Sequence, residues 1–148
     1  LNDIQQGMIY LLGKAAASPE VRQHAIMVTY SSSDRIASIY DWIKANMAYL
    51  PDPTFAELFI SPVKMINDWN LGLRLAGDCD DMALLATAMY RSIGISAQIA
   101  IIDQTGYGFD HAYCEAWSDV IGWVSVDPST TRVPLGWIIP YYRKITVK

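Results

Sequence analysis

The sequence has few cysteines and histidines, no basic run and no long apolar stretch. Its 148 residues include 2 Cys and 2 His, and 15 acidic residues outnumber 11 basic ones. A net charge of -4 without a basic run argues against binding to nucleic acid through its phosphates. No apolar stretch approaches the roughly 20 residues of a membrane span, and no signal peptide is evident. We therefore expect a cytoplasmic protein that binds neither nucleic acid nor membrane.

The two cysteines, Cys79 and Cys114, lie far apart and form no Cys-x-x-Cys motif. Such usage is typical of a reducing compartment, although the sequence leaves a disulfide between them open. With 148 residues, of which 52% are hydrophobic, the chain can bury a core without metals or disulfides. We expect a single domain over residues 1–148, with a helical N-terminal part over 1–50, a groove-forming loop region over 51–76, and a catalytic helix and sheet over 77–148.

Helical periodicity dominates the first half of the chain. Apolar spacing predicts helices over about 1–17 and 34–48, and Ser18-Pro19-Glu20 begins another that runs to about Thr29. Prolines end the helix near residue 50, and a loop-rich stretch with short helical turns at 57–59 and 63–69 is expected before Gly77. Long stretches with little regular structure are usually functional, so we expect this one to form a wall of a substrate groove.

Residues 77–94 predict a central, buried helix with Cys79 in its first turn, because the segment is apolar nearly all round and ends at a glycine. The unsatisfied N–H groups and the helix dipole at that position favour a thiolate. The carboxylates of Asp80 and Asp81 oppose it, so they must point away or find donors. Together with Asp78 they also allow a metal site, but their spacing fits no calcium loop and helix capping explains them. We expect no metal.

After Gly94 the apolar period changes from 3.6 to 2, which predicts strands over 95–102, 111–117, 122–127 and 138–147. Helices followed by strands indicate an α+β domain in which an antiparallel sheet packs on the helix that bears Cys79.

A cysteine nucleophile needs a base, and the base needs a group that orients it. His111 is the one histidine after Cys79 in the sequence. If the strands over 111–117 and 122–127 pair antiparallel, strand alternation makes Asp127 a cross-strand neighbour of His111 on the same face. Cys114 falls on the opposite face and is expected to pack in the core, while Glu115 is expected to form a structural salt bridge or hydrogen bond.

Four sequence blocks resemble the transglutaminase-like superfamily of papain-like Cys-His-Asp cysteine enzymes: Gly77-Asp78-Cys79-Asp80-Asp81, Arg91-Ser92-Ile93-Gly94-Ile95, His111-Ala112-Tyr113-Cys114-Glu115-Ala116-Trp117, and Gly122-Trp123-Val124-Ser125-Val126-Asp127-Pro128. The run from Tyr49 to Pro53, Ser61-Pro62 and the doubled aspartate are most similar to phage and prophage members. The resemblance implies a papain-like core with Cys79 as nucleophile, His111 as general base and then acid, and Asp127 as orienting carboxylate, without a cofactor.

The resemblance implies acyl transfer from peptide or isopeptide amides through a Cys79 thioester, and we expect hydrolysis by a cysteine peptidase or amidase. The backbone N–H of Cys79 would contribute to the oxyanion hole, with the second donor among Asn67, Trp69 and Asn70. Three alternatives stay open: transamidation that cross-links proteins, a catalytically silent protein-binding module, and a metal-dependent hydrolase that uses the aspartates with His111.

Overall fold

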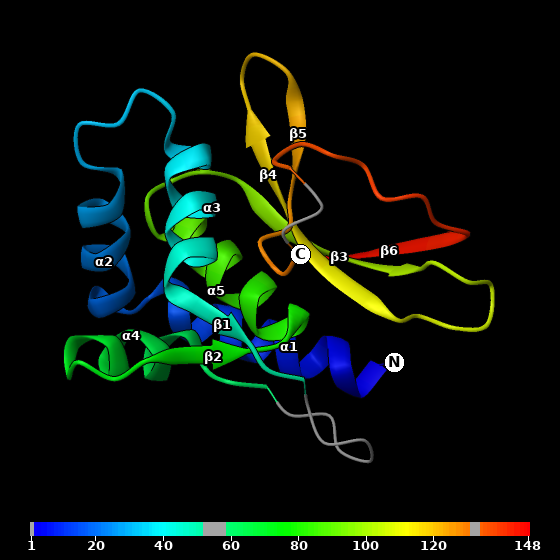
Figure 1. The fold of residues 1–148 in the computed structure, drawn as a ribbon, viewed down its shortest axis with the longest axis horizontal. Helices are drawn as coiled ribbons and strands as arrows, with labels where there is room; N and C mark the ends of the chain where they lie inside the picture. Colours follow the sequence, from blue (N-terminus) through cyan, green and yellow to red (C-terminus); the bar gives the residue numbers. More distant parts are fainter. Residues whose placement is uncertain (1, 52–58, 131–133) are drawn as a thin grey trace.

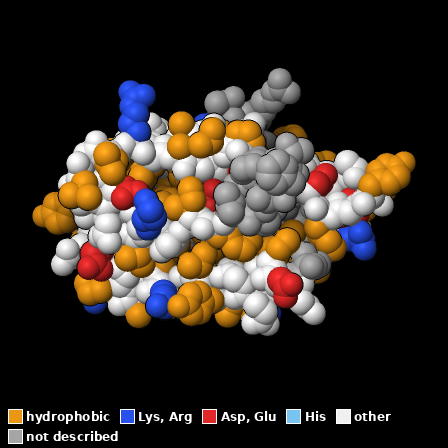
Figure 2. Space-filling view, turned by 90° about the horizontal axis from the view of Figure 1, so that it is seen from below, with side chains coloured by type: hydrophobic (Ala, Val, Ile, Leu, Met, Phe, Trp, Pro, Cys, Tyr) orange, Lys and Arg blue, Asp and Glu red, His pale blue; other side chains and the backbone are white. Residues whose placement is uncertain are grey.

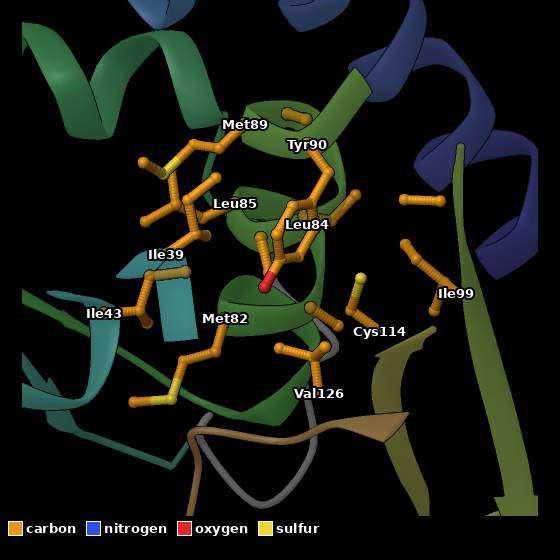
Figure 3. Packing of buried hydrophobic residues seen from close by; sticks show 14 of the residues in the cluster. Ile39, Ile43, Met82, Leu84, Leu85, Met89, Tyr90, Ile99, Cys114 and Val126 are labelled. Carbon is orange, nitrogen blue, oxygen red and sulfur yellow. The ribbon is translucent and has the colours of Figure 1, made fainter. Parts of the chain in front are cut away.

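Helix α5 (Cys79–Ser92) lies between a group of helices and a four-stranded sheet (Figure 1). The computed structural model describes residues 2–51, 59–130 and 134–148. In it, every residue of α5 from Asp81 to Tyr90 is buried. Figure 3 shows Ile39 and Ile43 on one side of this helix and Ile99, Cys114 and Val126 on the other. The all-round apolar surface of the helix is thus explained, because it is covered on both sides.

The remaining helices follow the sequence signals closely. They are α1 (Asn2–Ala16), α2 (Pro19–Thr29), α3 (Arg35–Asn46) and α4 (Pro62–Asn70). Ser18 caps α2 by accepting the backbone N–H of Val21, with a proline in the first turn. Asp34 caps α3 by accepting the N–H of Ala37 at 3.0 Å. Local capping chemistry therefore fixes where these helices begin.

Two short strands were not expected from the sequence. β1 (Met47–Tyr49) follows α3 directly, where helix was predicted to continue, and β2 (Leu75–Gly77) lies in the stretch predicted as loop. They pair in parallel, with Tyr49 opposite Gly77. Strands of three residues are too short to show alternation in the sequence, and each of these two pairs with a distant segment. Local sequence patterns therefore predict neither strand. The helical turn predicted at 57–59 lies largely outside the described residues.

The four-stranded sheet confirms the α+β prediction. Its strands are β3 (Ala97–Asp103), β4 (His111–Ser118), β5 (Gly122–Val126) and β6 (Arg143–Val147), in the antiparallel order β5-β4-β3-β6. The strand predicted over 138–147 begins only at Arg143, since Pro140 cannot donate to a ladder. Before it, Ile139 packs against Ala100, Ile102 and Tyr113 on the sheet face away from α5. Residues that follow β5 therefore cover part of the outer face.

In the described part of the chain, none of the helices combines the length and the apolar character needed to cross a bilayer. The face seen from below carries hydrophobic side chains in several separate clusters, with isolated charged side chains between them (Figure 2).

Candidate active site

A capping box fixes the N-terminus of α5, where Cys79 lies. The side chain of Asp78 accepts the backbone N–H groups of Asp80 at 3.1 Å and Asp81 at 3.2 Å. In return, Asp81 accepts the backbone N–H of Asp78 at 3.0 Å, and its other oxygen accepts that of Ile60 at 2.8 Å. The carboxylate of Asp81 is thus used in the cap and in holding the segment that leads to α4. Cys79 is held on a rigid helix end.

Gly77 is required by the space that this cap occupies. A Cβ atom at residue 77 would lie 2.6 Å from Cε of Met47 and 2.7 Å from both Cβ and Oδ2 of Asp81. The glycine therefore lets the Asp81 side chain fold back over the strand that delivers Cys79. Glycine is needed at residue 77 because the side chains of Met47 and Asp81 approach the backbone closely, and not because of an unusual backbone angle.

The Cys79 thiol is protonated in its resting environment. Burial is the main cause that raises its pKa to about 12, and the neighbouring carboxylate of Asp80 is the next. Sγ lies 4.0 Å from Oδ1 of Asp80, to which the thiol donates. The backbone N–H of Ala112 lowers the pKa but does not offset these effects, and Asp78 and Asp127 add to them. The expectation that the helix dipole would favour a thiolate is therefore wrong, because burial of the thiol, and after it the carboxylate of Asp80, outweighs the effect of the helix end.

His111 and Asp127 meet at the end of the sheet. Nε2 of His111 lies 2.7 Å from Oδ2 of Asp127, whose side chain is only 2% exposed. Ser129 donates its backbone N–H at 3.2 Å and its hydroxyl at 2.6 Å to Oδ1 of the same carboxylate. Burial opposes ionisation, but these hydrogen bonds and the charge of His111 hold the pKa of Asp127 below its ordinary value. Asp127 is thus an ionised group that orients the histidine ring.

The sheet register explains how these residues converge. β4 pairs with β5 so that Cys114 lies opposite Val126. One further step places Asp127 opposite Tyr113, on the face that also carries His111. The sulfur of Cys79 approaches the same place, since it interacts with the N–H of Ala112 and with the charge of Asp127. Since Asp127 engages Nε2, Nδ1 is the ring nitrogen that can serve the thiol.

A pocket of about 410 Å³ opens beside the histidine. Its walls include His111 and Asp127 together with Tyr49 and Trp137. Since the His111 side chain is 15% exposed, a substrate can reach the ring from solvent. The sequence interpretation assigned no role to Tyr49 or Trp137. The pairing of Tyr49 with Gly77, which brings it near Cys79, has no local signal in the sequence.

The three expected oxyanion-hole donors lie on α4, and none of them lines this pocket. The ring of Trp69 lies 5.1 Å from that of Trp42 and lines a different pocket, which also contains Arg74. Asn67 and Asn70 are exposed on the same helix. Tyr49, by contrast, lines the pocket with His111.

The remaining predictions for this region concern Cys114, Glu115 and a metal site. Cys79 and Cys114 are both free thiols, and Cys114 is fully buried in the core. Glu115 accepts hydrogen bonds from Gln98 at 2.9 Å and from Lys144 at 2.6 Å, as expected for a structural group. Within residues 2–51, 59–130 and 134–148, no three or more His, Cys, Asp or Glu side chains form a group that could hold a metal ion.

Comparison with known proteins gives a family and a fold. Residues 23–128 match the model of the transglutaminase-like superfamily. No curated protein is similar enough to count as a match. A candidate cysteine protease from Cytophaga hutchinsonii shares 22% identity over 83% of this chain and 42% of its own, with a TM-score of 0.60.

Two further structures share this architecture. The periplasmic domain of TgpA from Pseudomonas aeruginosa has a TM-score of 0.52 and 21% identity, over 80% of this chain and 48% of its own. Red sea bream transglutaminase has a TM-score of 0.53 and 15% identity, over 80% of this chain and 26% of its own. At these identities the likeness is one of fold. This chain spans less than half of each of the three structures.

Proposed function

Because this chain belongs to the transglutaminase-like superfamily, we propose that it transfers acyl groups from peptide or isopeptide amides through a thioester on Cys79. Cys79 is the nucleophile, His111 the general base and then the general acid, and Asp127 the group that orients the ring. Water is the proposed acceptor, which makes the protein a cysteine peptidase or amidase.

The hydrogen bond of 2.7 Å between His111 and Asp127, formed beside the helix end that carries Cys79, is the observation that supports this proposal best. A carboxylate that holds one ring nitrogen fixes the tautomer of the other and stabilises the imidazolium when it forms. The third member of a catalytic triad has both tasks: it orients the neutral imidazole and it stabilises the imidazolium.

The protonated state of the thiol decides how the reaction begins. With a thiol pKa of about 12, little thiolate exists at neutral pH, so His111 accepts the proton as sulfur attacks the carbonyl carbon. The resulting imidazolium donates that proton to the leaving amine as the C–N bond breaks. Water, deprotonated by the same ring, then attacks the thioester and releases the carboxylic acid and the free thiol.

The oxyanion of the tetrahedral intermediate needs donors, and the backbone N–H of Cys79 is the first. The cap uses the N–H groups of Asp80 and Asp81 and not that of Cys79. We assign the second donor to the hydroxyl of Tyr49. Tyr49→Phe is expected to lower kcat for amide hydrolysis by about 10², whereas Trp69→Phe on α4 leaves kcat unchanged. Equal effects of the two substitutions would remove Tyr49 from this role.

Acylation by p-nitrophenyl acetate tests the proposal directly. We expect a stoichiometric burst of p-nitrophenolate, with one acetyl group located on Cys79 by mass spectrometry. Cys79→Ala should abolish the burst. The matched control is Cys114→Ala, since Cys114 is the other free thiol but is fully buried, and this variant should acylate like the wild type.

The fate of the acetyl group separates the alternatives. Release as acetate supports hydrolysis, and preferential transfer to an added amine such as glycinamide would favour transamidation. Acylation of Cys79 by p-nitrophenyl acetate that is no faster than that of a free thiol and is unchanged in His111→Ala would favour a silent protein-binding module. Loss of activity with a chelator but not with alkylation would favour the metal-dependent alternative.

A further inference from the structure

We propose that the pocket beside His111 binds the amine portion of the substrate and that Trp137 selects an aromatic or large aliphatic residue directly after the scissile amide. This inference rests on the proposed function. It concerns the pocket of about 410 Å³ described above.

The position of the general acid assigns the pocket to one side of the scissile bond. His111 must come within hydrogen-bond reach of the leaving nitrogen to protonate it. The pocket is lined by His111 and Asp127, whereas Cys79, which holds the acyl portion, does not line it. Side chains that share this pocket with the ring therefore contact the residue that carries the leaving amine.

The walls of the pocket suit a bulky uncharged group. Trp137 is 57% exposed and Tyr49 is 54% exposed, although both line a concave surface. Ile139 adds an aliphatic wall, and the polar residues among the walls include Gln104 and Thr130, which carry no charge. Aromatic side chains exposed in a cavity gain most from burying another ring or a large aliphatic side chain.

The charges nearby disfavour an acidic residue at this position. The two cations at the start of β6 are already paired. Arg143 pairs with Asp103 at 3.1 Å, and Lys144 pairs with Glu115 at 2.6 Å. Neither cation lines the pocket, whereas the carboxylate of Asp127 does. A carboxylate on the leaving residue would lie near the charge of Asp127, and neither Arg143 nor Lys144 would be available to pair with it.

Trp137 is held in place before any substrate arrives. Its backbone N–H donates to the carbonyl of Pro134 at 3.1 Å, and that of Gly136 donates to Ser125 at 2.9 Å. Gly136 has a φ of 86°, a left-handed angle that suits glycine. Ile139, two residues on, packs against the outer face of the sheet. Because the backbone that carries the ring is already fixed by these contacts, only the side chain of Trp137 has to be ordered on binding.

Partition of the acyl-enzyme between water and amines tests the inference, because the attacking amine occupies the site of the leaving amine. Acetyl-Cys79 is formed with p-nitrophenyl acetate and offered glycinamide, phenylalaninamide or glutamic acid α-amide. The amine nitrogen bonds to the acetyl carbon, the C–S bond breaks, and His111 returns the amine proton to sulfur. The N-acetyl amides and acetate are quantified by mass spectrometry.

We expect phenylalaninamide to be acetylated about tenfold faster than glycinamide, and glutamic acid α-amide no faster than glycinamide. Trp137→Ala should abolish the preference, and Trp137→Phe should keep most of it. Trp123→Ala is the matched control, since Trp123 is 46% exposed and does not line the pocket. A preference that is absent in the wild type, or that survives Trp137→Ala, would overturn the inference.

A binding measurement decides the inference even if no acetyl-Cys79 forms, an outcome that would count against the proposed function alone. In the Cys79→Ala variant, phenylalaninamide should shift the indole N–H resonance of Trp137, assigned with Trp137→Phe, more than glycinamide at the same concentration does. Equal shifts with the two amides, or none, would contradict a pocket selective for an aromatic residue.

Discussion

The two histidines of the chain stand in opposite kinds of environment. His24, in α2, is 5% exposed and meets the ring of Trp42 at 4.3 Å. Its Nε2 has no hydrogen-bond partner within the part of the chain that the structure describes. His111 is also largely covered, but its Nε2 lies 2.7 Å from the Asp127 carboxylate and its ring faces a pocket.

The difference shows that a buried histidine with a carboxylate partner and a buried histidine without one are suited to different roles. Burial lowers the pKa of His24 to about 4, because it removes the solvent that would stabilise the charge of an imidazolium. At His111 a buried carboxylate stabilises that charge when it forms. The same side chain is therefore a packing group among helices in one place and, in the proposed mechanism, the base at the end of the sheet in the other.

Replacement of each histidine in turn should give the largest difference in the rate of Cys79 acylation. His111→Ala removes the base, so acylation of Cys79 is expected to fall by about 10³ to 10⁴. His24→Phe replaces one flat ring by another against Trp42, and acylation should stay at the wild-type rate. The p-nitrophenolate burst measures both.

A loss of acylation in His24→Phe, in a variant whose thermal unfolding is unchanged, would contradict this assignment. Asp127→Asn is the companion variant, because it keeps the ring but removes the charge that orients it. We expect it to lose activity to a similar extent as His111→Ala.

Acid should destabilise the protein through His24 before it affects Asp127. The folded pKa of His24 is about 4 and lies below its ordinary value of 6.5, so the unfolded state binds more protons between these pH values. The free energy of unfolding therefore falls as pH drops from about 6.5 to about 4, by roughly 3 kcal/mol in total. Urea denaturation at a series of pH values measures this slope.

His24→Phe should flatten the slope in that window. Asp127 makes a separate contribution with a lowered pKa, so its stabilisation is present above the ordinary aspartate pKa and is lost only as pH falls below it. The variant should therefore keep the decline at the lowest pH values. An unchanged slope between pH 4 and 6.5 would show that His24 is not buried as a neutral ring.

The placement of the three site residues was accessible from the sequence because each signal is local or depends on a simple register. The Gly-Asp-Cys start of α5, alternation along β4 and the end of β5 at Val126 together place Cys79, His111 and Asp127 near one another. The helix beginnings at Ser18 and Asp34 were accessible for the same reason, since a cap is a contact between close neighbours in sequence.

The features that escaped prediction depend on contacts between distant segments. β1 and β2 pair across a long stretch of chain, and that pairing brings Tyr49 toward Cys79. The raised pKa of the Cys79 thiol depends first on burial and then on which acid faces it. Asp81 turns back into the cap while Asp80 lies 4.0 Å from the sulfur, a division that adjacent identical residues do not reveal in a sequence.

The smallest expected effect concerns the reactivity of the Cys79 thiol. If His111 is needed because Cys79 is protonated at rest, removal of the charge that helps to keep it protonated should make the thiol more reactive without the histidine. Asp80→Asn is expected to lower the pKa of Cys79 from about 12 and to raise its iodoacetamide alkylation rate at pH 8 by about tenfold.

The rate is measured against pH in both proteins, with Asp119→Asn as the control. Asp119 is an exposed acid that accepts a hydrogen bond from the indole N–H of Trp117 at 3.2 Å, and its loss should leave the profile unchanged. The wild-type rate should still rise at the highest accessible pH, while that of Asp80→Asn should level off earlier. A wild-type rate already constant at neutral pH would mean a resting thiolate paired with imidazolium, and His111 would then act from the start as a cation instead of a base.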